Sequence, residues 1–192
     1  MKEVANSSAS VRFNLKNDPK ALASAAFNAK RLGMSLNDIK SSSESTLDFE
    51  SSIAKEMNAE LLLGKELNLE KLRSAALTGD TETATKEMNR LISENKDGIK
   101  GNVIVQKAFA DSLGISVDQL LESIQLNELQ DKLAAKGITD RVKAQKALNA
   151  LKSKGLSSDE ALLEISKGNL DSIIKNKEIE EASTRTLNEA KE

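Results

Sequence analysis

The sequence contains no cysteine, histidine, tryptophan or tyrosine, and it has a single proline. Without cysteine there can be no disulfide framework and no thiolate chemistry. The lack of both cysteine and histidine removes the ligands of an ordinary zinc site, and the lack of histidine removes the commonest general base. We therefore predict a protein that is not an enzyme and that has no catalytic, cofactor-binding or metal-binding residues.

Aromatic residues and long hydrophobic runs are also scarce. Four phenylalanines are the only aromatic residues, so a core must rest on leucine, isoleucine, alanine, valine and methionine, which favours helices over a β-sandwich or barrel. No run approaches the ~20 apolar residues that cross a bilayer, and the first 15 residues lack the apolar centre of a secretory signal. The net charge is −2, too small to attract nucleic acid by an overall field. We expect an intracellular protein without a membrane span.

Most of the nine glycines occur where an amphipathic segment would end, and a capping residue often follows within a few positions. This pattern predicts an all-α chain, a multi-helix array of short helices joined by glycine-capped corners. Residues 49, 53, 57 and 61 are apolar and share one helical face, and burial of such stripes would stabilise helix pairs. The expected helices cover 20–32, a run after Ser35, 46–63, 69–78, 82–94, 103–113, 117–136, 140–154, 158–167 and 170 to about 190.

The N-terminal residues have a different pattern. Val11, Phe13 and Leu15 alternate with polar residues, which is a weak strand signal. We predict an extended N-terminal arm over residues 1–19; the alternative is a small hairpin involving residues 9–16. Asp18 as the cap and Pro19 at the first helical position then begin the first helix. The predicted divisions are this arm, a helical domain over 20–130, and a C-terminal helical region over 131–192 with a basic segment at 132–154.

One octapeptide pattern occurs twice, as LGMSLNDI at 32–39 and as LGISVDQL at 113–120. In each, glycine turns the chain, the next apolar residue folds back on the preceding helix, and serine caps the new helix with a capping-box partner three residues later. The capping pairs are Ser35 with Asp38 and Ser116 with Gln119. Looser copies of the pattern occur at 136–142 and 154–160.

Residues 106–124 resemble a bacterial repressor helix-turn-helix. The resemblance lies in turn-forming and packing positions, whereas a recognition helix must also contact bases and phosphates. No lysine or arginine occurs from position 113 through 130, so a phosphate backbone would be repelled. DNA binding is therefore the alternative, and a structural corner is favoured. The matching residues are Ala108, Ala110, Leu113, Gly114, Ile115 and Ser116, and the acidic residues nearby are Asp118, Glu122 and Glu128.

Two further features allow a functional interpretation. Glu56 and Glu60 lie one helical turn apart, and paired carboxylates can carry out acid–base chemistry or hold two metal ions. Surface ion pairing with Lys55 and Lys65 is the favoured interpretation. The basic segment at 132–154 could bind nucleic acid or acidic lipid, but a solvated helix face explains it better, because no aromatic residue interleaves for base stacking.

The segment at 45–80, STLDFESSIAKEMNAELLLGKELNLEKLRSAALTGD, resembles a recurring segment of tail tape-measure and related virion proteins of large tailed bacteriophages. The resemblance covers roughly residues 30–130. It implies a mostly helical, non-catalytic virion component, assembled in the host cytoplasm, with copies of itself and other tail proteins as partners. The matching positions are Leu47, Phe49, Glu50, 59–65, 68–71, Arg73, 75–80 and 103–120.

Two departures from that family limit the resemblance. A tape measure sets tail length by its extended length, and this chain could span at most ~290 Å as one helix, which its glycine corners prevent. It also lacks the long apolar segments of many members, so a membrane-penetrating role is not implied. The leading hypothesis is a helical module of a tape-measure-like virion protein, either a segment of a longer protein or a smaller protein. A helix-turn-helix DNA-binding protein and a carboxylate enzyme are the alternatives.

Overall fold

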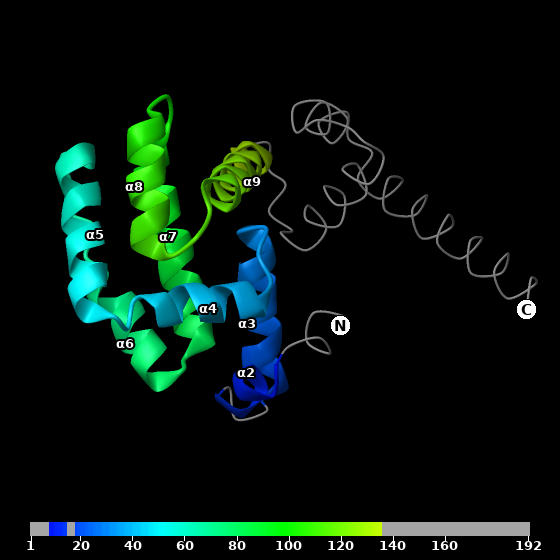
Figure 1. Cartoon of the computed structure of the whole chain (residues 1–192). Helices are drawn as coiled ribbons and strands as arrows, with labels where there is room; N and C mark the ends of the chain where they lie inside the picture. Colours follow the sequence, from blue (N-terminus) through cyan, green and yellow to red (C-terminus); the bar gives the residue numbers. More distant parts are fainter. Residues whose placement is uncertain (1–7, 15–17, 136–192) are drawn as a thin grey trace, which may run out of the picture. The chain divides into compact units, whose positions relative to one another are not determined.

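A computed structural model describes residues 8–14 and 18–135 (Figure 1). These residues form eight helices and no strand, which confirms the all-α prediction. The chain divides into two compact units, Met1–Asn127 and Glu128–Glu192. The helices predicted beyond residue 135, the basic segment and the looser corners at Gly137 and Gly155 lie outside the described residues, apart from positions 132–135. The helices are α2 Ala9–Asn14, α3 Pro19–Arg31, α4 Leu36–Ser45, α5 Phe49–Leu63, α6 Glu70–Thr78, α7 Thr81–Ile99, α8 Val103–Leu113 and α9 Val117–Ala135.

The helices pack in pairs that bring together distant parts of the sequence (Figure 1). Helix α5 lies beside α8, α3 lies beside α7, and α4 contacts α3, α6 and α7. The core between them is aliphatic, with Phe109 as its one fully buried aromatic side chain among the described residues. Each large side chain that folding removes from water contributes about 1.5–3 kcal/mol. The other largest fully buried residues are Leu32, Leu36, Ile39, Leu69, Leu72, Met88, Leu91, Ile92, Ile99, Leu113 and Leu120.

The prediction of an extended N-terminal arm is wrong for residues 9–14, which form helix α2. The Ser8 side chain accepts a hydrogen bond from the Val11 N–H and so caps the helix. In a helix, residues two apart face in different directions. Val11 is therefore fully buried, whereas Phe13 is 78% exposed. The apparent alternation of apolar and polar residues was thus a short amphipathic turn that buries one valine against the rest of the unit.

The predicted start of the next helix is confirmed. Asp18 is the N-cap of α3 and accepts a hydrogen bond from the Lys20 N–H at 2.8 Å, and Pro19 is the first helical residue. Helix α7 differs from its prediction at both ends, because Asp80 caps it instead of Thr81, and it continues to Ile99 instead of ending near 94.

The two octapeptides form the predicted corners. Gly33 ends α3 with φ of 70°, in the left-handed region that glycine adopts without strain. The N–H groups of Gly33 and Met34 donate to the carbonyls of Lys30 and Ala29, at 3.1 and 3.0 Å, which closes the helix end. Met34 folds back and is buried. The corner after α8 has the same bonds, from Gly114 and Ile115 to Asp111 and Ala110.

Both predicted capping boxes are present. The Ser35 hydroxyl accepts from the Asp38 N–H at 3.1 Å, and the Asp38 carboxylate accepts from the Ser35 N–H at 2.9 Å. The Ser116 hydroxyl accepts from the Gln119 N–H at 3.1 Å, and the Gln119 side-chain oxygen accepts from the Ser116 N–H at 3.0 Å. Each box therefore satisfies two backbone groups that a helix start otherwise leaves without partners.

Each corner also contacts the helix that follows the other corner. The hydroxyl of Ser42 on α4 donates to the carbonyl of Leu113 at the end of α8. The hydroxyl of Ser123 on α9 donates to the carbonyl of Leu32 at the end of α3, at 2.5 Å. All four residues are buried. The two bonds are equivalent in sequence, because the donors Ser42 and Ser123 are 81 positions apart and the acceptors Leu32 and Leu113 are also 81 positions apart.

The glycines obey the same relation. A Cβ atom added to Gly114 would clash with the Ser45 hydroxyl on α4, and one added to Gly33 would lie 3.0 Å from the Glu122 side chain and 3.2 Å from the Leu126 side chain on α9. Ser45 and Leu126 are again 81 positions apart. The two helix–corner–helix units therefore make corresponding contacts with each other, and we call this arrangement the reciprocal corner contact. The leucine and glycine of each octapeptide thus lie against the helix that follows the other corner.

Replacement of Gly114 by alanine tests this contact against a matched glycine. Gly64 also has a positive φ, of 66°, but a Cβ there would meet nothing within 4 Å. Both variants should lose about 1–2 kcal/mol from left-handed strain. Gly114→Ala should lose roughly 1–3 kcal/mol more, because its methyl group enters a filled space. Urea unfolding followed by far-UV circular dichroism measures both, and equal losses would show that the corner is not packed against α4.

Candidate interaction surface

Helix α5 carries an exposed row of large apolar side chains. Phe49, Ile53, Met57 and Leu61 are 46%, 45%, 63% and 81% exposed. Their spacing of four places them along one face of the helix, as predicted, but that face is turned to solvent instead of being buried in a helix pair. The stripe is therefore not buried within the unit, and its burial in a helix pair with another protein stays a prediction.

The opposite face of α5 explains this inversion. It buries Ser52, Glu56 and Ala59, which are small or polar. Helix α6 supplies the partner, because the Arg73 guanidinium pairs with the Glu56 carboxylate and its Nε donates to the Ser52 hydroxyl at 3.1 Å. Arg73 and Glu56 are 7% and 9% exposed, so the pair is largely removed from water. Helix α5 thus packs beside α8, is joined to α6 by a hydrogen-bonded ion pair, and leaves its large apolar side chains exposed.

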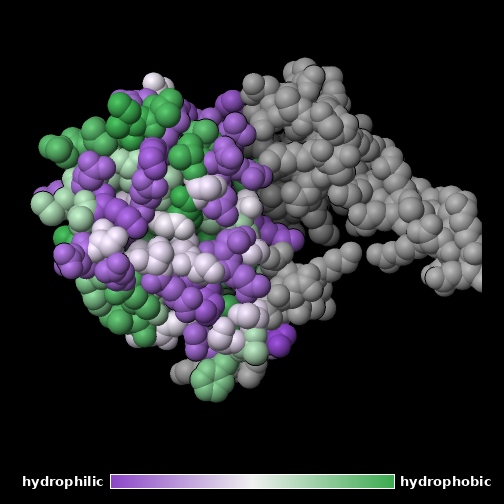
Figure 2. All heavy atoms as spheres, viewed as in Figure 1, coloured by the Kyte–Doolittle hydropathy of each residue, from purple (hydrophilic) through white to green (hydrophobic). Residues whose placement is uncertain are grey.

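The exposed apolar area continues from α5 onto the start of α8. Leu62 is 38% exposed, and Val103 and Ile104 are 73% and 67% exposed. Figure 2 shows hydrophobic residues gathered over the neighbouring ends of α5 and α8, at the top of the view. Large contiguous apolar patches on folded proteins mark interaction sites, whereas single exposed apolar residues are normal. We call this area the apolar surface; it consists of Phe49, Ile53, Met57, Leu61, Leu62, Val103 and Ile104.

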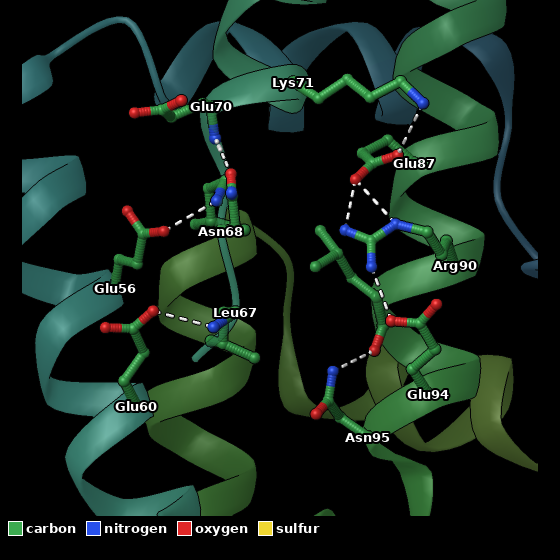
Figure 3. A network of polar contacts seen from close by, with 12 residues as sticks. Glu56, Glu60, Leu67, Asn68, Glu70, Lys71, Glu87, Arg90, Glu94 and Asn95 are labelled. Atoms are coloured by element: carbon green, nitrogen blue, oxygen red, sulfur yellow. Dashed lines mark hydrogen bonds and ion pairs between the residues drawn. The ribbon is translucent and has the colours of Figure 1, made fainter. Parts of the chain in front are cut away.

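Glu56 and Glu60, the predicted carboxylate pair, hold the connector that follows α5 (Figure 3). The Glu60 carboxylate accepts from the Leu67 N–H at 2.8 Å, and the Glu56 carboxylate accepts from the Leu69 N–H at 2.7 Å. With Arg73 on its second oxygen, Glu56 is occupied by structural bonds. The predicted surface ion pairs with Lys55 and Lys65 are wrong for these carboxylates, and the Lys65 ammonium donates instead to the Glu94 carbonyl at 3.3 Å.

Arg73 is the residue in this region that sequence reasoning missed. Its type alone suggests a solvated position, because arginine is rarely buried without a partner. The available signal was the polar and small row Ser52, Glu56 and Ala59, which repeats at helical spacing on the face opposite the apolar row. The sequence therefore shows that α5 has one polar face and one apolar face, but it does not show which of the two faces is buried.

A second acidic side chain, Glu87 on α7, is buried in a cluster of charges (Figure 3). Burial raises the pKa of the Glu87 carboxyl group. Hydrogen bonds and charges from Arg90 and Lys71 lower that pKa by more than burial raises it, so the pKa of Glu87 lies below its usual range. Arg90 also donates to the Glu94 carboxylate at 2.5 Å. Most of the cluster lies within α7, and the ammonium of Lys71 on α6 joins it at 3.5 Å from the Glu87 carboxylate. Within the described ranges, no group of three or more acidic residues is arranged to hold a metal ion.

The helix-turn-helix candidate at 106–124 corresponds to α8, the Gly114 corner and the first half of α9. Its second helix is committed to packing, because Leu120, Ser123 and Ile124 are buried. Its solvated side carries the carboxylates of Asp118 and Glu122, which phosphate groups would repel. The residues that resemble a repressor motif thus form the corner and its packing contacts.

No protein-family model matches the sequence, and comparisons with curated proteins and with solved structures find no significant match. In the part of the chain that the structure describes, no helix is both long enough and apolar enough to cross a bilayer.

Substitutions of the two carboxylates should separate their structural roles. Glu56→Ala leaves the buried Arg73 charge without its partner, and such losses cost about 3–5 kcal/mol. Glu60→Ala removes one hydrogen bond to a backbone N–H and should cost about 1 kcal/mol. Both values are measured by urea unfolding. If Glu56→Ala were no more damaging than Glu60→Ala, the buried ion pair would not hold α5 to α6.

The low pKa of Glu87 predicts a pH dependence of stability. A carboxyl whose pKa is lower in the folded than in the unfolded protein stabilises the fold above its unfolded pKa, near 4.5. That contribution is lost as the pH falls through the lower, folded value. Glu87→Gln should therefore reduce the loss of unfolding free energy between neutral pH and the acid range, relative to the wild type. The exposed residue Glu66 serves as the control, and a Glu66→Gln variant with the same effect would contradict the assignment.

Proposed function

We propose that this chain is a non-enzymatic structural protein that works by packing against other proteins through the apolar surface. The observation that carries the proposal is the inversion of α5. Its polar residues Glu56 and Ser52 are buried, and its largest apolar residues, Met57 and Leu61 among them, face solvent. Exposure of so much apolar area is unfavourable for an isolated protein, because burial of each large side chain is worth about 1.5–3 kcal/mol. A binding partner that covers the surface recovers that free energy.

We further propose that the setting is a bacteriophage virion, where the chain acts as a helical module of a tail tape-measure-like protein. The support is the resemblance of residues 45–80 and 103–120 to that family. These two stretches include all seven residues of the apolar surface, five in the first stretch and Val103 and Ile104 at the start of the second. A module that assembles by helix packing requires such an exposed apolar face, which is why the resemblance and the geometry agree.

The competing interpretation is a DNA-binding protein that uses residues 106–124. It is supported by the corner between α8 and α9, which has the glycine and capping serine of a helix-turn-helix. The carboxylates of Asp118 and Glu122 on the solvated side of α9 oppose it, as does the burial of Leu120 and Ser123. We therefore favour assembly over DNA binding.

Composition of purified phage particles tests the proposal. Mass spectrometry should detect the chain in particles made by the phage that encodes it, in a tail fraction. A tagged copy with Leu61→Glu should be incorporated at least about tenfold less than the tagged wild type, because burial of the new charge costs more than 1.4 kcal/mol.

Leu77 provides the matched control, because it is also exposed, at 64%, but lies on α6 outside the apolar surface. A tagged Leu77→Glu copy should be incorporated normally. Absence of the chain from particles would contradict the virion setting, and equal incorporation of both variants would contradict the role of the apolar surface. Salt-sensitive binding of the purified chain to duplex DNA that Ser116→Glu abolishes would favour the DNA-binding alternative.

A further inference from the structure

We infer that the apolar surface binds a second copy of this chain, with the two α5 helices packed antiparallel around Met57. This inference rests on the proposed function, in which the same surface mediates assembly, and it specifies the partner and the register. It is argued from three properties of the surface: its self-complementary ridges, the charges at its two ends, and its area.

The exposed face of α5 has the shape that a helix needs to pack against its own copy. Its residues form two parallel ridges at a spacing of four, one with Ile53, Met57 and Leu61, and one with Ala54, Asn58 and Leu62. Ridges of this spacing fit into the groove between the same ridges on a second helix, at an angle of about −50°. A twofold axis through Met57 places Ile53 of each copy opposite Leu61 of the other, and Met57 opposite its own copy, so the three residues of this ridge meet apolar partners.

The charges at the ends of α5 favour the antiparallel orientation. Exposed Glu50 lies in the first turn of the helix, and exposed Lys65 follows the last turn. An axis at Met57 brings Glu50 of one copy to the end of the partner helix where Lys65 lies, and it does so twice by symmetry. A parallel arrangement would instead place Glu50 beside Glu50, and like charges would face each other at both ends. The antiparallel arrangement also sets the helix dipoles in opposite directions.

The area of the surface reaches the size that a specific dimer needs. At about 100–150 Å² of apolar area for each large side chain, the exposed parts of the seven residues present roughly 500 Å². Two copies would bury roughly 1,000 Å² from these side chains alone, and Ala54 and Asn58 add to that area. Specific interfaces begin at about 1,000–1,200 Å². The surface therefore reaches the lower end of the size range of specific interfaces, which fits a reversible dimer of the isolated chain.

Sedimentation equilibrium of the full chain tests the inference first. The wild type should be a dimer at high micromolar concentration and dissociate on dilution. Met57→Glu places two like charges on the axis and should weaken the dimer at least about a hundredfold. Leu77→Glu, which adds the same charge to an exposed leucine on α6, should leave the dimer constant unchanged. Circular dichroism checks that each variant is folded, and Met57 is exposed enough for its replacement to leave the unit intact.

Disulfide cross-linking tests the register, because the natural chain has no cysteine to interfere. Met57→Cys should form a covalent dimer rapidly on mild oxidation, since two copies of this residue meet on the axis. Ile53→Cys mixed with Leu61→Cys should form a mixed dimer faster than either variant cross-links with itself. Leu77→Cys should react at the slow rate of random collision.

Each alternative outcome overturns a stated part of the inference. A wild type that stays monomeric at the highest soluble concentration, or a dimer that Met57→Glu does not weaken, overturns the second copy as the partner. A dimer that Met57→Glu dissociates overturns the antiparallel register if Met57→Cys does not cross-link, or if Ile53→Cys cross-links with itself faster than with Leu61→Cys. Neither result touches the proposed function, which fails only if the chain is absent from particles or if Leu61→Glu is incorporated normally. A monomer that still requires Leu61 for incorporation would bind a different tail protein.

Discussion

The reciprocal corner contact is the interaction on which the rest of this unit depends. Two buried serine hydroxyls, Ser42 and Ser123, each donate to the last carbonyl of the helix that precedes the other corner. Glycine at both corners is needed for the left-handed turn, and at Gly114 also for the close approach of α4. The two bonds place α3 with α4, and α8 with α9, in one defined arrangement. Helix α5 then packs beside α8, and α7 beside α3, so the surfaces discussed above inherit their positions from the two corners.

The polarity of α5 is the second constraint, and it connects the fold to the proposed function. A buried ion pair is costly to desolvate and contributes little net stability, so the pair of Glu56 and Arg73 is not an efficient way to hold a helix in place. It does define which face of α5 is inside, because only that face matches the guanidinium of Arg73 and the N–H groups of Leu67 and Leu69. The apolar row is thereby left outside. A protein that used the row for its own core would have no such surface left for assembly.

The sequence predicted the local structure well and the tertiary role of several residues poorly. Helix ends at Gly33 and Gly114, and the capping boxes at Ser35 and Ser116, depend on neighbouring residues, so their patterns are readable without coordinates. The burial of Arg73 and the exposure of Met57 depend on which helix lies beside which, and periodicity alone does not contain that information. The prediction for residues 9–14 was wrong for another reason, because three alternating residues are too few to distinguish a strand from a helical turn. The duplication was visible in the octapeptides, but the contact between the two copies was not.

The account therefore rests most directly on the proximity of each corner to the second helix of the other unit. Nuclear Overhauser spectroscopy on the isotopically labelled chain measures that proximity without altering a residue. We predict cross-peaks between the α protons of Gly114 and the β protons of Ser45, and between the α protons of Gly33 and the methyl protons of Leu126, because these groups lie in contact. A folded, helical chain that shows neither cross-peak would contradict the reciprocal corner contact and the arrangement of helices derived from it.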